Sequence, residues 1–147
     1  MDSPLKVVGQ LIDNQPVAIV GSVDDGGFPN AKAMLPPRRR EGLKTFYFTT
    51  NTSSRRVAQW RQRPQACLYF FDPQRFQGAL LTGTMEVLED AEHKALIWHD
   101  GDTIYYSQGV TDPDYCVLRF TAQSGRFYAN LGTEDFAIPD AAEVVER

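Results

Sequence analysis

The sequence has few cysteines, and neither lies in a metal-binding pattern. Cys67 and Cys116 are the two cysteines among 147 residues, and both stand in apolar, strand-like contexts. Disulfide scaffolds and zinc sites need more thiols or a short paired spacing, whereas isolated buried cysteines behave as small apolar residues. With no CxxC and no HExxH motif, the sequence predicts no disulfide framework and no bound metal.

Long hydrophobic runs are also missing. No stretch approaches the roughly 20 apolar residues that a membrane-spanning helix needs. The N-terminal segment is not typical of a signal peptide, because Lys6, Gly9 and Gln10 interrupt its apolar residues. We therefore expect a cytoplasmic protein without a membrane partner.

A surplus of positive charge is absent as well. Fifteen Lys and Arg residues oppose 19 Asp and Glu residues, which gives a formal net charge of −4. Proteins that bind nucleic acids usually carry a basic stripe, so we expect no nucleic-acid partner. The basic run RRREGLK, residues 38–44, is interpreted as a solvated loop.

The sequence is rich in aromatic residues and in short apolar runs bounded by turn residues. Aromatics make up 12% of the chain, which favours a β-rich core. Helical spacing predicts helices at 3–13 with Ser3 as N-cap, at 53–63 and at 90–98, and the tail after Leu131 is expected to wrap the surface. The apolar runs predict strands at 16–23, 30–35, 43–50, 65–72, 78–89, 116–122 and 125–130. The last two are expected to form a hairpin about a turn at Ser124 and Gly125.

These elements predict one domain, residues 1–147, that is mainly β with short helices. About six to seven antiparallel strands closed into a barrel would bury the apolar faces. A Rossmann domain is disfavoured, because strands and helices do not alternate regularly and no GxGxxG follows a strand.

The stretch TTNTSSRR, residues 49–56, is the strongest candidate for a binding site. Thr52 or Ser53 is expected to cap the following helix, whose free N–H groups would form an anion site. Arg55 and Arg56 stand where the helix dipole disfavours cations, and arginine can bind a phosphate through two hydrogen bonds. The alternatives are an ordinary capped helix with solvated arginines, or a docking surface for a partner.

Four stretches resemble the pyridoxamine 5′-phosphate oxidase-like superfamily, the FMN-binding split barrels. They are PNAKAML (29–35), FYFTTNTSSRR (46–56), LLTGTMEVLED (80–90) and VTDPDYCVLRF (110–120). The resemblance spans residues 5 to about 130 and is to the short bacterial branch of general-stress-type flavin proteins. It implies a split β-barrel, a homodimer, and FMN at the subunit interface.

The resemblance also implies a set of FMN-binding residues. Lys32 and the helix start at 54–56 would contact the phosphate, the backbone of 33–35 would lie along the isoalloxazine ring, and the strand end at 49–50 would lie near the flavin. The residues in this set are Lys32, Ala33, Met34, Leu35, Thr49, Thr50, Ser54, Arg55 and Arg56.

For function, the resemblance implies an FMN-dependent oxidoreductase acting on a small molecule. It argues against pyridoxamine phosphate as the substrate, because Pro37 stands where the oxidase has a substrate-binding lysine and the Arg-x-His motif of its tail is missing. The open alternatives are a non-catalytic flavin-binding or stress protein, a split barrel that binds haem or a deazaflavin, and a ligand-free dimerising protein.

No residue is assigned a catalytic role. His99 is expected to cap the preceding helix at the surface, and Trp98 beside it has no assigned role. Tyr105 and Tyr106 fit stacking on a flavin or substrate as well as packing in the core or at a dimer contact. The family's flavin-contacting glutamine corresponds to Gly78, with Gln77 beside it.

Overall fold

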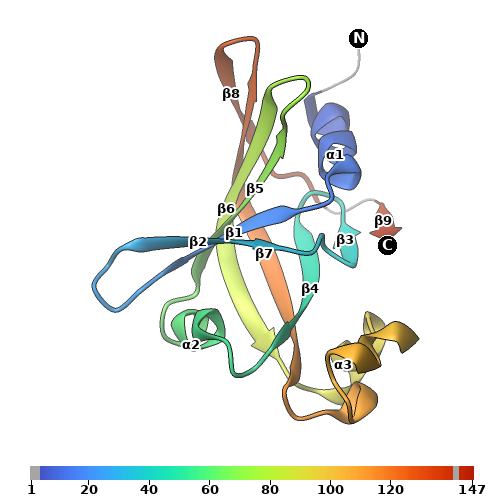
Figure 1. Ribbon diagram of the computed structural model, residues 1–147. Helices are drawn as coiled ribbons and strands as arrows, with labels where there is room; N and C mark the ends of the chain where they lie inside the picture. The colour runs from blue at the N-terminus through green and yellow to red at the C-terminus, as the bar shows by residue number, and fades with distance from the viewer. Residues whose placement is uncertain (1–3, 141–142) are drawn as a thin grey trace.

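The computed structural model describes residues 4–140 and 143–147, whose strands join in one antiparallel sheet. The strand order is β2-β1-β5-β6-β7-β4-β3-β9, and β8 pairs with β7 (Figure 1). The predicted class, mainly β and antiparallel with short helices, is confirmed. The strands are β1 (Ala18–Val23), β2 (Pro29–Met34), β3 (Arg39–Glu41), β4 (Thr45–Asn51), β5 (Gln65–Asp72), β6 (Gln77–Leu88), β7 (Tyr115–Ala129), β8 (Gly132–Ala137) and β9 (Val144–Glu146).

The helices lie around the sheet at different places. Helix α2 lies beside the β1–β2 hairpin, while α3 and the 3-10 segments lie at one end of the molecule (Figure 1). The predicted N-cap of the first helix, Ser3, lies outside the described residues. The helices are α1 (Pro4–Asn14), α2 (Arg55–Gln62) and α3 (Ala91–Leu96), and the 3-10 segments are η1 (Asp100–Ile104) and η2 (Gly109–Thr111).

The core is aromatic where β4, β5 and β7 face one another. The ring of Phe46 lies 6.4 Å from that of Phe70 and 6.2 Å from that of Phe120, measured between centroids. Val57 and Trp60 of α2 are also buried in this core. Burial of these apolar side chains fixes α2 against the sheet, so the start of α2 has a defined position.

The hairpin turn predicted at Ser124 and Gly125 is wrong, because β7 continues through both residues. A register shift in the β6–β7 pairing falls between Thr82 and Gly83. A Cβ on Gly83 would lie 2.0 Å from the carbonyl oxygen of Thr121. The two strands therefore approach closely at a bulge, which bends them without ending either.

Strand β8 was not predicted from the sequence. The tail after Leu131 was expected to wrap the surface, but it forms a strand that pairs with β7. Asn130 and Leu131 have φ of 53° and 63°, and this left-handed pair turns the chain back onto β7. A Cβ on Gly125 would lie 2.3 Å from the ring of Phe136 in β8. The glycine interpreted as a turn residue is instead covered by that ring.

The basic run at 38–44 is not the solvated loop that was predicted. Arg40 is 4% exposed and donates hydrogen bonds to both carboxylate oxygens of Asp13, at 2.8 and 2.7 Å. Arg39 pairs with Glu146, at 2.6 Å. These pairs lie beside the β3–β9 pairing. Strands β3 and β9 have three residues each, which is too short for an alternating apolar pattern to be visible in the sequence. With β3, β8 and β9, the described strands number nine.

Candidate functional site

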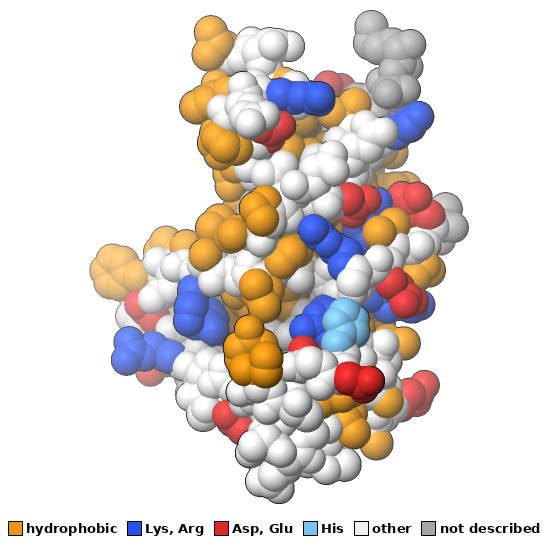
Figure 2. Space-filling model, turned by 45° about the vertical axis from the view of Figure 1, so that its right-hand side comes forward, with side chains coloured by type: hydrophobic (Ala, Val, Ile, Leu, Met, Phe, Trp, Pro, Cys, Tyr) orange, Lys and Arg blue, Asp and Glu red, His pale blue; other side chains and the backbone are white. Residues whose placement is uncertain are grey.

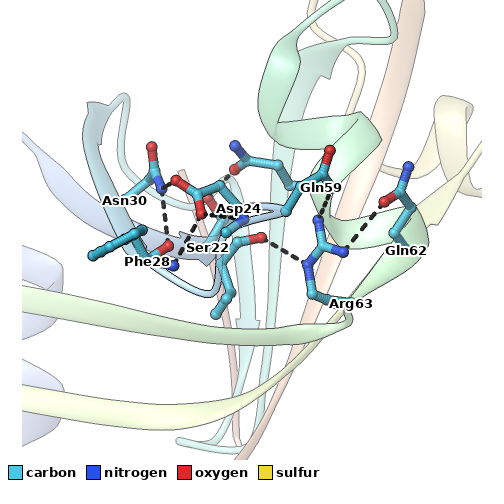
Figure 3. Close-up of polar contacts among 10 residues, drawn as sticks. Ser22, Asp24, Phe28, Asn30, Gln59, Gln62 and Arg63 are labelled. Atoms are coloured by element: carbon cyan, nitrogen blue, oxygen red, sulfur yellow. Dashed lines mark hydrogen bonds and ion pairs between the residues drawn. The ribbon is translucent and has the colours of Figure 1, made fainter.

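Polar contacts fasten the β1–β2 hairpin to helix α2 (Figure 3). The hydroxyl of Ser22 donates a hydrogen bond to the side-chain carbonyl of Gln59. Arg63, just after α2, donates to the carbonyl oxygen of Val23 at 3.1 Å and to Asp25 at 2.6 Å. These contacts hold β1 and the hairpin turn against α2, and β2 is positioned through its pairing with β1.

The hairpin turn is itself held by one carboxylate. Asp24 accepts hydrogen bonds from the backbone N–H groups of Gly26 and Phe28, at 3.0 and 2.9 Å, and from the amide of Asn30 at 3.0 Å (Figure 3). The bond from Asn30 is the largest cause that lowers the pKa of Asp24, followed by the one from Phe28. A fixed turn sets which residues of β2 face α2.

Helix α2 is capped by Ser54, so the predicted cap at Thr52 or Ser53 is wrong. The hydroxyl of Ser54 accepts from the backbone N–H of Val57 at 3.2 Å. Thr52 and Ser53 are instead held by Asp114, which accepts from the Thr52 hydroxyl at 2.8 Å and from the Ser53 N–H at 3.0 Å. The bond from Thr52 is the largest cause that lowers the pKa of Asp114.

Three of the predicted site residues meet at one hollow, which we call the cationic hollow. Lys32 of β2 and Arg55 and Arg56 of α2 line it, together with Gln59 and residues 30–31, and its volume is about 290 Å³. Within the described chain, none of the three cations has a carboxylate partner. This contrasts with the basic run at 38–40, where every arginine is paired.

The guanidinium of Arg56 is the clearest indication that the cationic hollow suits an anion. Its Nε is buried and has no hydrogen-bond partner among the described residues. Burial also lowers the pKa of Arg56. A buried N–H without a partner is costly, and an anion in the cationic hollow would remove that cost. Two or three cations beside the start of a helix fit a phosphate group.

A second hollow, which we call the ring hollow, lies at the other end of the same two chain segments. Leu35, Thr49 and Thr50 line it, with a volume of about 490 Å³. The segments 30–35 and 49–56 each run from one hollow to the other. Six of the nine predicted residues thus line the two hollows, while Ala33, Met34 and Ser54 line neither.

The far side of the ring hollow is formed by Arg38, Asn51, Asp114 and the segment 104–106. Tyr106 is buried and packs on Trp98 and Tyr115, with centroid distances of 6.3 and 5.0 Å. Burial raises the pKa of Tyr106 to about 12. Tyr105 is 68% exposed, so the structure separates the two tyrosines into a core residue and an exposed one.

Three other residues singled out in the sequence lie elsewhere. His99 does not cap α3, which ends at Leu96, but precedes η1 as its N-cap. Gln77 begins β6, and a Cβ on Gly78 would lie 2.3 Å from the hydroxyl of Tyr69. Neither Gln77 nor Gly78 lines the cationic or the ring hollow.

Several residues that position the site could not be recognised from the sequence. Gln59 bonds to Ser22, 37 positions away, and Asp114 bonds to Thr52, 62 positions away. Partners so far apart form no short pattern. The sequence TDPDY around Asp114 indicates a turn, and only the fold shows what that carboxylate holds.

Residues 4–140 and 143–147 contain no group of three or more His, Cys, Asp or Glu side chains that could hold a metal ion. No helix in those ranges has the length and apolar character needed to cross a membrane. On the face drawn in Figure 2, Lys and Arg side chains are interspersed with Asp and Glu.

The antiparallel sheet with its few short helices has the architecture of a split barrel. The chain belongs to the pyridoxamine 5′-phosphate oxidase family, whose sequence model matches residues 6–129. The resemblance inferred from the sequence is therefore confirmed. The comparison with curated proteins gave no match.

Solved structures show the same relationship. A protein from Clostridium acetobutylicum related to general stress protein 26 of B. subtilis is 40% identical, with a TM-score of 0.83, over 91% of this chain and 94% of that one. General stress protein 26 from Bacillus anthracis is 14% identical, with a TM-score of 0.73, over 90% and 97%. A heme binding protein from Mycobacterium smegmatis is also 14% identical, with a TM-score of 0.74, over 93% and 59%. The last two share the fold.

Proposed function

We propose that this protein binds FMN and is an oxidoreductase that acts on a small molecule. The observation that carries the proposal is the buried, unpartnered Nε of Arg56 beside two further cations, Lys32 and Arg55, that have no carboxylate partner in the described chain. Membership of the pyridoxamine 5′-phosphate oxidase family supports it.

The two hollows would hold different parts of FMN. Lys32, Arg55 and Arg56 would neutralise the phosphate, and the free N–H groups of the first turn of α2, which begins after the cap at Ser54, would add hydrogen-bond donors. The backbone of 33–35 and the strand end at 49–50 would lie along the ring system. The bound flavin supplies the electron or hydride chemistry, and the protein supplies binding, orientation and electrostatics.

We propose further that FMN lies at the interface of a homodimer. Strand β2 is at the edge of the sheet, and its residues 29–33 are exposed. An exposed edge strand with small apolar residues such as Ala31 and Ala33 is suited to cover by a second chain. Sedimentation equilibrium should give twice the monomer mass, and a monomer that still binds FMN would contradict the interface.

The direct test compares FMN with riboflavin, which has the same ring but no phosphate. We expect the purified, untagged protein to quench FMN fluorescence on binding, with an affinity for riboflavin at least tenfold weaker, since a charge-assisted contact contributes roughly 1.5–3 kcal/mol. Equal affinities for the two flavins would contradict the phosphate assignment. A Soret band in the purified protein would favour haem instead.

A non-catalytic flavin-binding or stress protein would use the same residues. The 40% identical relative is described as related to general stress protein 26. This description supports a stress protein as the second candidate function. To distinguish an oxidoreductase from a non-catalytic binding protein, the bound flavin is reduced anaerobically and small-molecule electron acceptors are then added. Reoxidation by an acceptor supports the oxidoreductase, and a flavin that never turns over supports the binding protein.

A further inference from the structure

The ring hollow has a side that the predicted FMN residues do not form. We call it the η1 wall, and it consists of Ile104, Tyr105 and Tyr106. Ile104 is 83% exposed and Tyr105 is 68% exposed, and Leu35, also lining the hollow, is 62% exposed. Three large apolar side chains thus converge on one hollow although each is open to solvent.

The η1 wall is a built structure, held by buried contacts. Asp102 of η1 is 4% exposed. It accepts two hydrogen bonds from Arg38, at 2.6 and 2.7 Å, and one from the backbone N–H of His99 at 2.9 Å. Tyr106 packs into the aromatic cluster behind the wall. The wall therefore has a fixed position in the hollow that Thr49 and Thr50 also line.

Charge distinguishes the ring hollow from the cationic hollow. Its charged lining residues, among those described, are Arg38 and Asp114. The carboxylate of Asp102 neutralises Arg38, and hydrogen bonds led by that of Thr52 keep Asp114 ionised by lowering its pKa. An anionic group placed here would find no unpaired cation and would face a carboxylate. Neutral groups would find the hydroxyls of Thr49 and Thr50.

We propose that the η1 wall binds the substrate, and that the substrate is an apolar ring compound without a phosphate or carboxylate group. The inference rests on the proposed function, because a substrate of the flavin has to lie against its ring, and the η1 wall faces the residues assigned to that ring. The exposed ring of Tyr105 offers a stacking partner, and Ile104 and Leu35 add apolar area.

The test uses two probes that share one ring system, 2-naphthol and 2-naphthyl phosphate. Both are titrated calorimetrically into FMN-saturated protein, so that the cationic hollow is filled. We expect 2-naphthol to bind about tenfold or more tightly than the phosphate ester, because the ester brings charge into a site without a counter-charge. Equal or tighter binding of the ester, or no binding of 2-naphthol, overturns the inference.

A charge change in the wall sharpens the test. Ile104→Lys should shift the preference toward 2-naphthyl phosphate about fivefold or more, because it adds a cation beside the bound group. Leu131→Lys makes the same change at a position that is 91% exposed and outside the hollow, and should leave the preference unchanged. Equal shifts in both variants overturn the assignment to the η1 wall.

A second variant removes the stacking surface without adding charge. Tyr105→Ser should weaken 2-naphthol about fivefold or more while FMN binding stays unchanged. If FMN itself fails to bind, the proposed function fails, and the same titrations in excess inorganic phosphate still decide between the two probes. Undiminished binding of 2-naphthol by Tyr105→Ser overturns the inference in either case.

Discussion

Arg38 and Asp102, 64 positions apart, form a bidentate ion pair with N–O distances of 2.6 and 2.7 Å. Arg38 also donates to the carbonyl oxygen of Ile97 at 3.0 Å. The pair joins the segment before β3 to η1, and both side chains are largely buried. It sets where the η1 wall stands relative to β4.

The first prediction concerns the pH dependence of this pair. The hydrogen bonds from Arg38 are the largest cause that lowers the pKa of Asp102 below its ordinary 3.8. A lowered folded-state pKa stabilises the fold above pH 3.8, and that stabilisation is lost as the pH falls through the folded value. Asp102→Asn should lower the free energy of unfolding by roughly 2–4 kcal/mol at pH 7, because Arg38 loses its counter-charge.

Urea denaturation of both proteins at several pH values checks this. The difference between wild type and Asp102→Asn should be constant near neutrality and shrink below pH 3.8. Asp100→Asn, at an exposed position of the same 3-10 segment, should change little. A difference that does not vary with pH would show that the pair does not contribute through its charge.

The second prediction concerns Arg56. Arg56→Ala should weaken FMN by about 2 kcal/mol, the scale of a charge-assisted hydrogen bond, and should leave riboflavin unchanged because riboflavin has no phosphate. The protein should not lose stability, since the variant removes a buried N–H that has no partner in the described chain. The measurement is fluorescence titration with both flavins.

Arg61→Ala is the matched control on the same helix. Arg61 pairs with Glu89 at 2.8 Å and lies in the last turn of α2, away from the cationic hollow. We expect its FMN affinity to equal that of wild type. If Arg55→Ala together with Arg56→Ala also left FMN affinity unchanged in a folded protein, the phosphate assignment would be wrong.

The third prediction concerns the contact between Ser22 and Gln59. Ser22→Ala leaves the buried amide of Gln59 without its partner, so the free energy of unfolding should fall by roughly 1–3 kcal/mol. FMN affinity should fall as well, because the contact holds β1, and through their pairing β2, against α2. Thermal denaturation and FMN titration measure the two effects.

A double variant tests the reason for that loss. In Ser22→Ala with Gln59→Leu, both polar partners are gone, so part of the lost stability should return. Ser107→Ala, at an exposed position, controls for loss of a hydroxyl. A double variant less stable than Ser22→Ala would show that Gln59 contributes by other contacts.

The fourth prediction concerns the bulge in the long strands. A Cβ on Gly83 would meet the backbone oxygen of Thr121 at 2.0 Å, and a backbone atom cannot move aside as a flexible side chain can. Gly83→Ala should therefore destabilise the fold by about 3 kcal/mol or more. Gly101→Ala, where nothing lies within 4 Å of the added Cβ, is the control, and equal stability of the two variants would contradict the account.

The mainly β antiparallel class and the arginines at the helix start could be predicted because they are local. Apolar runs bounded by turn residues mark six of the strands, β1, β2, β4, β5, β6 and β7. The hypothesis of an anion site rested on two arginines in the first turn of a predicted helix, where the helix dipole disfavours cations. This conflict is visible within residues 53–56. Periodicity and helix dipoles act over a few residues, so one sequence suffices to detect them.

What the tertiary structure decided depends on partners far apart in the chain. It determined that residues 38–40 are paired cations while Lys32, Arg55 and Arg56 have no carboxylate partner in the described chain. It also separated buried Tyr106 from exposed Tyr105. A Lys or Arg looks the same in the sequence whether or not a carboxylate lies beside it. The pairing of the strands decides whether a distant carboxylate comes close enough to pair with the cation or leaves the cation able to bind a ligand.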